Sequence, residues 1–342
     1  MITSKDSTEN KEYFSKSDGV SSRVKRIGVL TSGGDCSGMN ACVRSIVRTA
    51  LSQGIEVYGF KKGYQGLLDN DYRSLTSQDV SGKIGRAGTF LQSARCLEFK
   101  TDEGMKRGHE NLIDLGIDGI IVIGGNGSLS GALKLHEIGV PAVGVPASID
   151  NDLYGTDMSM GVDSALNVIV NAVDMIRDTA SSHDRMFIIE VMGRNCGYLA
   201  LASAVATGAE AALIPEVPYN LDEIARRLKR RFKEKKTNSI IIVSEGAGSA
   251  ADFAAKLTGK VGYDIRVSVL GHMQRGGNPS VFDRVLASKM GRNAVLALEK
   301  GESGVMMTYC DSVYSSISLS EALSKQRPLS QSLLDLAALL ES

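Results

Sequence analysis

Short apolar runs of strand length alternate along the chain with longer segments whose apolar residues recur every three or four positions. Residues 26–31 form such a run, followed by a glycine-rich turn and an amphipathic segment that ends near residue 54, and residues 116–139 repeat this plan. Continuous apolar runs are typical of strands buried on both faces. The alternation therefore predicts an α/β protein whose parallel sheets are covered by helices on both faces.

The same alternation continues through the second half of the chain. Further apolar runs begin at residues 140, 186, 211, 239 and 265, and the segments between and after them have helical periodicity. No repeat of solenoid length and no low-complexity insert interrupts this order. We expect two doubly wound, Rossmann-like domains of three layers each, with a boundary near Gly161.

Composition narrows the class of protein. The 342 residues are 43% hydrophobic and 23% charged, which suffices for two globular domains. The 39 basic and 39 acidic residues balance, so no nucleic-acid or anionic membrane partner is expected, and the basic run 226–236 is interpreted as a solvated helix face. No apolar run approaches the roughly 20 residues of a membrane-spanning helix.

Cysteine usage and the opening segment indicate a cytoplasmic setting. The five cysteines include no CxxC pair, and no cleavable signal segment is recognisable. Residues 1–24 are polar and of mixed charge, and we expect them to form a disordered extension.

Polar or glycine-rich clusters follow six of the expected strands. The clusters are 31–35, 124–128, 148–152, 192–197, 244–248 and 271–277. Ligands of open α/β sheets bind beyond the carboxyl ends of the strands, so each cluster is a candidate for the ligand site.

The first two clusters are glycine turns that lead into helices. Bare backbone N–H groups and a helix N-terminus can hold phosphate oxygens. The same glycines could instead allow close packing of helix and strand, and the pattern leaves both interpretations open. Neither turn matches the P-loop GxxxxGK[ST] or the dinucleotide-binding GxGxxG, so those two nucleotide-binding motifs are disfavoured.

The third cluster places Asp150, Asn151 and Asp152 directly after a buried strand. An Asx turn explains one such residue more readily than three in a row. One carboxylate could remove a proton from a hydroxyl while its neighbour orients a cation, as phosphoryl transfer requires. Arg194 and Arg275 are flanked by glycines, and their guanidinium groups suit phosphate oxygens.

Seven segments now become recognisable together. They are GVLTSGGDCSGMNACVR, GGNGS, PASIDND, SSHDR, EVMGRNCGYLALASA, SEG and VLGHMQRGGNPSVFDRVLASKMG. In this order they resemble the 6-phosphofructokinase family, most closely its short bacterial, ATP-dependent type, over roughly Arg26 to Gly301. The resemblance implies transfer of the γ-phosphoryl group of ATP to the 1-hydroxyl of fructose 6-phosphate, giving fructose 1,6-bisphosphate and ADP. It also implies Mg²⁺ as cofactor and a homotetramer.

The resemblance further implies which parts of the chain bind which ligand. A nucleotide-binding domain would comprise residues 25–161 and 274–324, and a sugar-phosphate-binding domain residues 162–273 and 325–342. The residues expected at ATP are Gly34, Tyr64, Arg95, Cys96, Asn126, Gly127, Ser128 and Gly131. Those expected at fructose 6-phosphate are Ser148, Asp150, Asp152, Arg185, Met192, Gly193, Arg194, Glu245, Arg266, His272 and Arg275.

Roles follow from the same resemblance. Asp150 would be the general base, with Arg194 and Arg95 neutralising the transferred phosphoryl group, and Asn126 and Asp152 would hold Mg²⁺. Two of the sugar-phosphate residues, Arg185 and Arg266, would reach the site of a neighbouring subunit. An effector site for ADP or phosphoenolpyruvate, formed between subunits, would use Arg44, Arg48, Arg177, Gly208, Glu210 and Lys236.

The chain departs from the family pattern at four informative positions. Asn126 stands where the family has a carboxylate that helps to organise Mg²⁺, and Ala147 and Ser148 replace a Gly-Thr pair. Pyrophosphate-using relatives have Asp and Lys where this chain has Gly127 and Ala147, so ATP is favoured as the donor. Gly82 lies near where bacterial members have an effector-site Asp. The alternatives are a pyrophosphate-dependent enzyme and a catalytically weak, effector-binding subunit.

Overall fold

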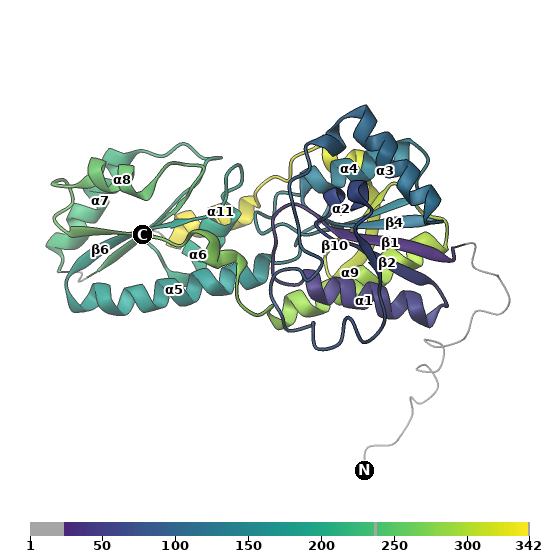
Figure 1. The fold of residues 1–342 in the computed structure, drawn as a ribbon. Coiled ribbons are helices and arrows are strands. Elements are labelled where there is room, and N and C mark those ends of the chain that lie inside the picture. The colour runs from purple at the N-terminus through teal and green to yellow at the C-terminus, as the bar shows by residue number, and fades with distance from the viewer. Residues whose placement is uncertain (1–23, 236–237, 341–342) are drawn as a thin grey trace, which may run out of the picture.

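The computed structural model describes residues 24–235 and 238–340, so nearly all of the expected extension and Lys236 lie outside the described residues. The strands are β1 (Arg26–Thr31), β2 (Glu56–Phe60), β3 (Tyr72–Ser74), β4 (Gly119–Gly124), β5 (Ala142–Pro146), β6 (Arg185–Val191), β7 (Ala211–Leu213), β8 (Ser239–Ser244), β9 (Asp264–Val269), β10 (Val305–Cys310) and β11 (Val313–Ser318). They form two sheets, which belong to two units lying side by side (Figure 1).

Helices occupy most of the segments between the strands. The α-helices are α1 (Met39–Ser52), α2 (Tyr64–Asp69), α3 (Asp102–Asp114), α4 (Asn126–Glu137), α5 (Val162–Ser182), α6 (Tyr198–Thr207), α7 (Leu221–Lys233), α8 (Ala250–Leu257), α9 (Val281–Glu299), α10 (Leu319–Ser324) and α11 (Gln331–Leu340). The 3₁₀ helices are η2 (Glu98–Lys100) and η3 (Gly271–Arg275).

The first unit is built on a seven-stranded sheet with the order β11-β10-β5-β4-β1-β2-β3. Its five inner strands are parallel, and the edge strands β3 and β11 run antiparallel to their neighbours. Alternate residues of β1 face opposite sides: Ile27 and Val29 pack in the core that includes α1 and α9, whereas Leu30 packs in the core that includes α2, α3 and α4. Apolar helices thus cover both faces, which explains why the inner strands are continuously apolar.

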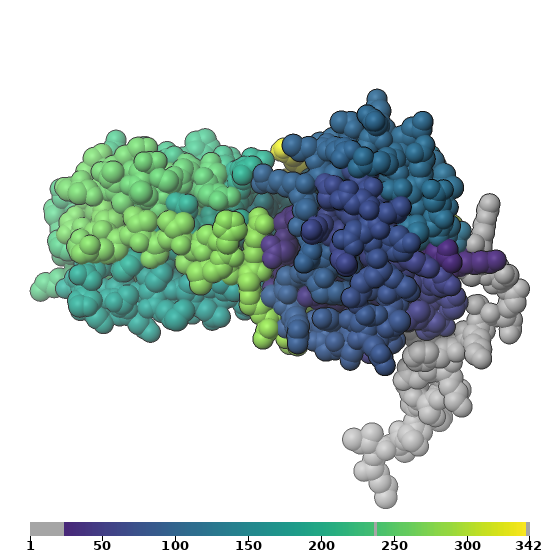
Figure 2. All heavy atoms as spheres, in the orientation of Figure 1, coloured from purple at the N-terminus to yellow at the C-terminus, as the bar shows by residue number. Residues whose placement is uncertain are grey.

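The second unit is built on a parallel four-stranded sheet with the order β7-β8-β6-β9. One face packs against α7 and α8, and the other packs against α5, α6 and α11. The α/β class and the two doubly wound, three-layer units expected from the sequence are confirmed. Figure 2 shows the two units as adjoining lobes.

Three segments connect the units, namely residues 147–161, 270–280 and 325–330. Where the first two meet, Asp283 of α9 is fully buried and accepts hydrogen bonds from the N–H groups of Gly161 and Ser164, at 2.9 and 2.8 Å. The hydroxyl of Ser164 donates to the same carboxylate at 2.6 Å. No side chain of its own N-cap residue satisfies the first turn of α5, so a residue of α9 performs the capping.

Candidate active site

A cavity of about 680 Å³ lies at the carboxyl ends of β1, β4 and β5, a volume usual for small-molecule sites. All eight residues predicted to contact ATP line it: Gly34, Tyr64, Arg95, Cys96, Asn126, Gly127, Ser128 and Gly131. Ser148, Asp150, Asp152 and Arg275 of the predicted sugar-phosphate set line it as well. Segments far apart in the sequence therefore meet at the carboxyl ends of the strands, where the sequence predicted the ligand site.

Both glycine turns form walls of this cavity. Gly33 has φ +84°, a conformation that favours glycine, and its carbonyl accepts a hydrogen bond from the Ser93 hydroxyl at 2.7 Å. A Cβ atom on Gly34 would lie 2.5 Å from Nη1 of Arg275, so the missing side chain lets this guanidinium lie against the turn. The helix α4 begins at Asn126 without a side-chain cap, which leaves its first N–H groups available for phosphate oxygens.

Gly127 differs from the other glycines of the cavity. A Cβ atom there would meet nothing within 4 Å, and its φ is not positive, so neither packing nor backbone strain requires a glycine. Its missing side chain instead leaves the cavity open. This observation supports a ligand that needs space beyond its phosphate groups.

Tyr64 forms a rigid wall of the cavity. It stacks on Phe99 with ring centroids 4.1 Å apart, and its hydroxyl donates to the carbonyl of Ser128 at 2.6 Å. Burial raises the pKa of Tyr64 well above its usual value. A Cβ atom on Gly131 would lie 2.7 Å from the Tyr64 ring, so Gly131 allows the tyrosine to pack against α4.

The electrostatics of the cavity centre on Asp150. Burial raises its pKa to about 6, and the nearby carboxylates Asp152 and Glu245 act in the same direction. Arg275 and Arg194 oppose that rise. Asp150 is thus a carboxylate with unusual affinity for a proton, surrounded by cations from both units.

Asn151, between the two acids, organises the loop. It is fully buried with φ 53°, and its amide group donates to the carbonyl of Asp157 at 3.0 Å and accepts from the N–H of Ser159 at 3.0 Å. The Ser159 hydroxyl in turn bonds the carbonyl of Ser148. The sequence suggested chemistry for the whole triplet, but the structure gives Asn151 a structural role that fixes the two flanking acids.

Asn126 and Asp152 are in direct contact. The Asn126 amide donates to Oδ2 of Asp152 at 2.8 Å, and the Ser148 hydroxyl donates to Oδ1 at 3.3 Å. One carboxylate and one amide oxygen are oxygen donors of the kind that Mg²⁺ uses beside phosphate groups, so the pair fits the expected cation. Among the residues that the structure describes, no group of three His, Cys, Asp or Glu side chains could form a metal cage.

The second unit contributes residues from the ends of β6 and β8. Glu245 N–H bonds the carbonyl of Val191 at 2.9 Å, and Gly246 N–H bonds the carbonyl of Gly193 at 3.1 Å. Met192 N–H bonds the side chain of the buried Gln274 at 3.1 Å. These bonds join three predicted clusters, and the side chains of Arg194 and Glu245 come close enough to influence Asp150.

The remaining predicted sugar-phosphate residues lie apart from this cavity. Arg185 and Arg266 stand toward the amino ends of β6 and β9, where both bond Oδ2 of Asp264, at 3.3 and 2.7 Å. β9 is an edge strand, and Arg266 is exposed on it. His272 is an exposed residue of η3. The chain's own fold therefore does not bring Arg185 or Arg266 to Asp150.

The predicted effector residues fall into two groups. Arg177 donates to the carbonyl of Thr207 at 2.7 Å and lies beside Gly208, while Glu210 is buried and pairs with Arg231 at 2.8 Å. Arg44 and Arg48 lie on α1 in the other unit, where burial and mutual repulsion lower the pKa of Arg44.

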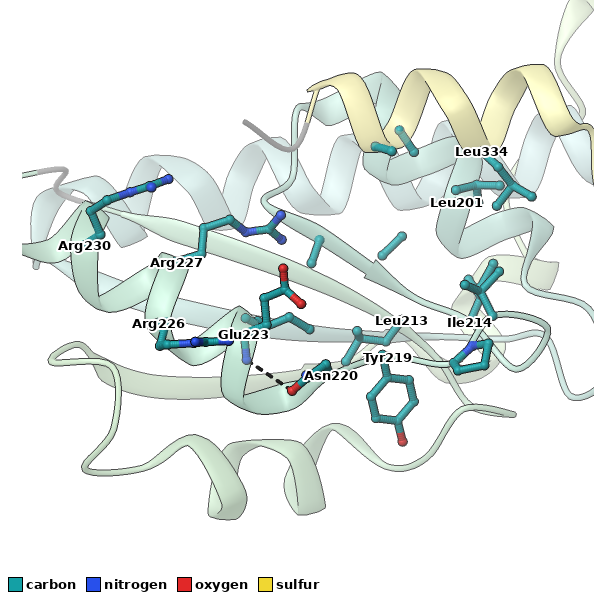
Figure 3. A pocket seen from close by; sticks show the side chains of 17 residues that line it. Leu201, Leu213, Ile214, Tyr219, Asn220, Glu223, Arg226, Arg227, Arg230 and Leu334 are labelled. Carbon is teal, nitrogen blue, oxygen red and sulfur yellow. Dashed lines mark hydrogen bonds between the residues drawn. The ribbon is translucent and has the colours of Figure 1, made fainter.

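A second groove of about 800 Å³ runs beside the edge strand β7, between α7 on one side and α6 and α11 on the other (Figure 3). None of the predicted site residues that the structure describes lines it. Arg226, Arg227 and Arg230 of α7 form one wall, and Arg231 forms the ion pair with Glu210. The interpretation of residues 226–236 as a wholly solvated face was therefore too simple.

The fold and this cavity define an α/β protein whose ligand site combines glycine turns, a half-buried carboxylate and arginines, a set suited to phosphate groups. The model of the Phosphofructokinase family matches residues 26–298, and the chain belongs to that family.

Curated relatives agree with this assignment. The chain is 54% identical to the ATP-dependent 6-phosphofructokinase of Halalkalibacterium halodurans over 82% of this chain and 88% of that one. It is 48% identical to the ATP-dependent 6-phosphofructokinase of Thermotoga neapolitana over 93% of this chain and all of that one.

A solved phosphofructokinase from Saccharomyces cerevisiae superimposes with a TM-score of 0.82 at 36% identity. It covers 93% of this chain, but the chain spans only 47% of the yeast one. Within residues 24–235 and 238–340, no helix is long and apolar enough to cross a membrane.

Proposed function

We propose that this protein is an ATP-dependent 6-phosphofructokinase, a phosphotransferase of glycolysis that phosphorylates the 1-hydroxyl of fructose 6-phosphate. The observation that carries the proposal is Asp150, a carboxylate with a pKa of about 6 that lines a cavity together with two glycine turns. The relatives named above, at 48–54% identity, carry this activity in their names.

Asp150 is suited to act as a general base. A pKa of about 6 keeps it ionised at neutral pH while giving it more affinity for a proton than an ordinary aspartate. In the proposed reaction it accepts the proton of the sugar hydroxyl as that oxygen attacks the γ-phosphorus. The bond to the β-phosphate oxygen breaks, and ADP leaves with the electron pair.

Arginines supply the positive charge for the transferred group. Arg95 and Arg275 line the cavity, and Arg194 faces Asp150 from the second unit. The first N–H groups of α4 add donors at the phosphate end of the nucleotide. Because transferred phosphoryl groups spread negative charge over their oxygens, fixed donors from two sides stabilise the transition state.

Asp152 and Asn126 are the residues that would hold Mg²⁺. When bound, the cation would neutralise phosphate charge. Ser148 and Asn126 orient the Asp152 carboxylate by donating to its two oxygens.

The cavity favours ATP over pyrophosphate as the donor. Gly127 leaves open space where pyrophosphate-using relatives have an Asp, and Ala147 is a small, buried residue where they have a Lys. A nucleoside moiety needs the room that these positions leave. Tyr64, Phe99 and Leu97 provide apolar wall for its base.

The sugar-phosphate side is completed, in this proposal, by a second subunit. Arg266 is exposed on the edge strand β9, and the half-buried Arg185 lies beside it on β6; both are away from Asp150, as expected of residues that serve a neighbour. The same reasoning applies to Arg44 and Arg48, which would meet the Arg177 and Gly208 group of another chain to bind ADP or phosphoenolpyruvate. These placements fit a homotetramer. The five free cysteines fit a cytoplasmic setting.

A coupled assay tests the proposal. Purified protein should phosphorylate fructose 6-phosphate with ATP and Mg²⁺. Pyrophosphate at the same concentration should support less than about a hundredth of that rate, which corresponds to a difference of about 2.7 kcal/mol in activation free energy. Turnover with pyrophosphate alone would establish the pyrophosphate-dependent alternative. If the protein is inactive with both donors but still binds ADP, the result would favour the alternative of a catalytically weak, effector-binding subunit.

A further inference from the structure

Arg327 lies in the segment that runs from α10 of the first unit to α11 of the second. Its Nη1 donates to the carbonyl of Asn151 at 3.1 Å, and its Nη2 donates to the carbonyl of Asp157 at 2.9 Å. These two carbonyls stand on opposite arms of the loop that carries Asp150 and Asp152. One guanidinium group therefore bridges both arms.

The bond to Asn151 is the critical one. Within the described residues, Arg327 is the only hydrogen-bond donor recorded for the carbonyl of Asn151, which lies between the two acids of the site. Asn151 is fully buried, and a buried carbonyl without a donor is costly. Asp157 is less dependent, because its carbonyl also accepts from the Asn151 amide.

Arg327 is itself held in place by the second unit. Its guanidinium lies over the ring of Tyr198, the first residue of α6, with 5.2 Å between Cζ and the ring centroid. The preceding residue, Gln326, forms an antiparallel bridge with Leu153, which follows Asp152 in the loop. The side chain thus has one fixed position between α6 and the loop.

We propose that Arg327 is a positioning residue of the phosphotransferase: it fixes the Asn151 carbonyl and thereby the placement of Asp150 and Asp152 relative to the second unit. The inference rests on the proposed function. Arg327 lies beyond residues 26–298, which match the family model, so the motifs that carry the resemblance did not indicate it.

The proposed role requires a side chain with two hydrogen-bond donors in one planar group. Two carbonyls are bonded by two nitrogens of one planar group, whereas a lysine offers a single charged nitrogen. We expect Arg327→Met to lower kcat by about 10–100-fold, because small displacements of a catalytic group have effects of that size. The KM values for ATP and fructose 6-phosphate should change less than about threefold, since Arg327 does not line the cavity. Arg327→Lys should recover part of the lost turnover.

Chemical rescue and a split between kcat and KM separate positioning from a merely structural role. A protein that only unfolds in part loses kcat in proportion to its unfolded fraction, whereas a displaced Asp150 lowers the kcat of the folded protein. Added guanidinium ion, at concentrations below those that unfold the protein, should restore part of the kcat of Arg327→Met. The control is Arg226→Met, an exposed arginine of α7 remote from the loop, which should leave kcat and both KM values unchanged with or without guanidinium ion.

Three results would overturn the inference. One is an unchanged kcat in Arg327→Met. Another is a kcat loss in Arg327→Met that only matches the unfolded fraction measured by thermal melting. The third is that Arg327→Lys and Arg327→Met have the same folded fraction and lose the same share of kcat, and that guanidinium ion does not restore it. Failure of the proposed function would be distinguishable, because the unsubstituted protein would then not phosphorylate fructose 6-phosphate.

Discussion

The nucleotide side and the sugar-phosphate side of the site are built differently. Every residue predicted for ATP lines one cavity of the first unit, enclosed by turns and helices of the same chain. The sugar-phosphate set is divided: Ser148, Asp150 and Arg275 line that cavity, whereas Arg185 and Arg266 lie apart from it, toward the amino ends of their strands. One chain thus brings together every residue predicted for ATP, but it does not bring together every residue predicted for fructose 6-phosphate.

The largest effect is expected for Asp150→Asn, because Asp150 lies where the nucleotide side and the sugar-phosphate side of the site meet. The substitution keeps the shape of the side chain but removes the base, so kcat should fall by roughly 10²–10⁴-fold with little change in either KM. Steady-state kinetics with both substrates measure this. A variant that keeps most of its turnover would exclude Asp150 as the base.

The next test addresses the division directly. Arg266→Ala should raise the KM for fructose 6-phosphate by about 10–100-fold, as expected for the loss of a charged contact to phosphate, and should leave the KM for ATP nearly unchanged. When Arg266→Ala and Asp150→Asn proteins are mixed and reassembled, sites with one intact Asp150 and one intact Arg266 should regain low KM turnover. If the reassembled hybrids do not recover, Arg266 either serves the site of its own subunit or contacts no substrate.

A smaller effect concerns the pH dependence of turnover. Because the pKa of Asp150 is raised to about 6, the base is ionised above that pH, and kcat should fall about tenfold per pH unit as the pH drops below 6. Asp152→Asn removes a like charge that contributes to the rise, so its acid limb should lie at lower pH. An acid limb near the ordinary Asp value in the unsubstituted protein would contradict the buried setting of Asp150.

The smallest expected effect is that of Asn126→Asp, which restores the carboxylate typical of the family on the nucleotide side. The new acid would face Asp152 in place of the present 2.8 Å hydrogen bond, so the pair should attract Mg²⁺ more strongly. The Mg²⁺ concentration for half-maximal rate should fall about 3–10-fold, and Mg²⁺ should raise the melting temperature of the variant more than that of the parent. Superimposable Mg²⁺ titrations would mean that position 126 does not serve the cation.

The sequence was sufficient for the features that depend on local pattern. Apolar periodicity predicted the α/β class, and the rule that ligands bind at strand ends placed Asp150, Asp152 and the glycine turns together. It could not assign Asn151 its structural role, because an amide between two acids looks the same whether it binds a ligand or fills a buried loop. Arg327 had no local signal at all, since its two acceptors are backbone carbonyls at residues 151 and 157.

The connection of α5 to α9 through Asp283 has a consequence for biosynthesis. The cap joins residues that are 122 and 119 positions apart, and β10 and β11 of the first sheet come later still in the chain. All four strands of the second sheet have been synthesised once Val269 has left the ribosome, at a pace of roughly 5–20 residues per second. The sheet that begins the chain is therefore the last of the two to be completed, and until α9 emerges the first turn of α5 stands without the carboxylate that caps it.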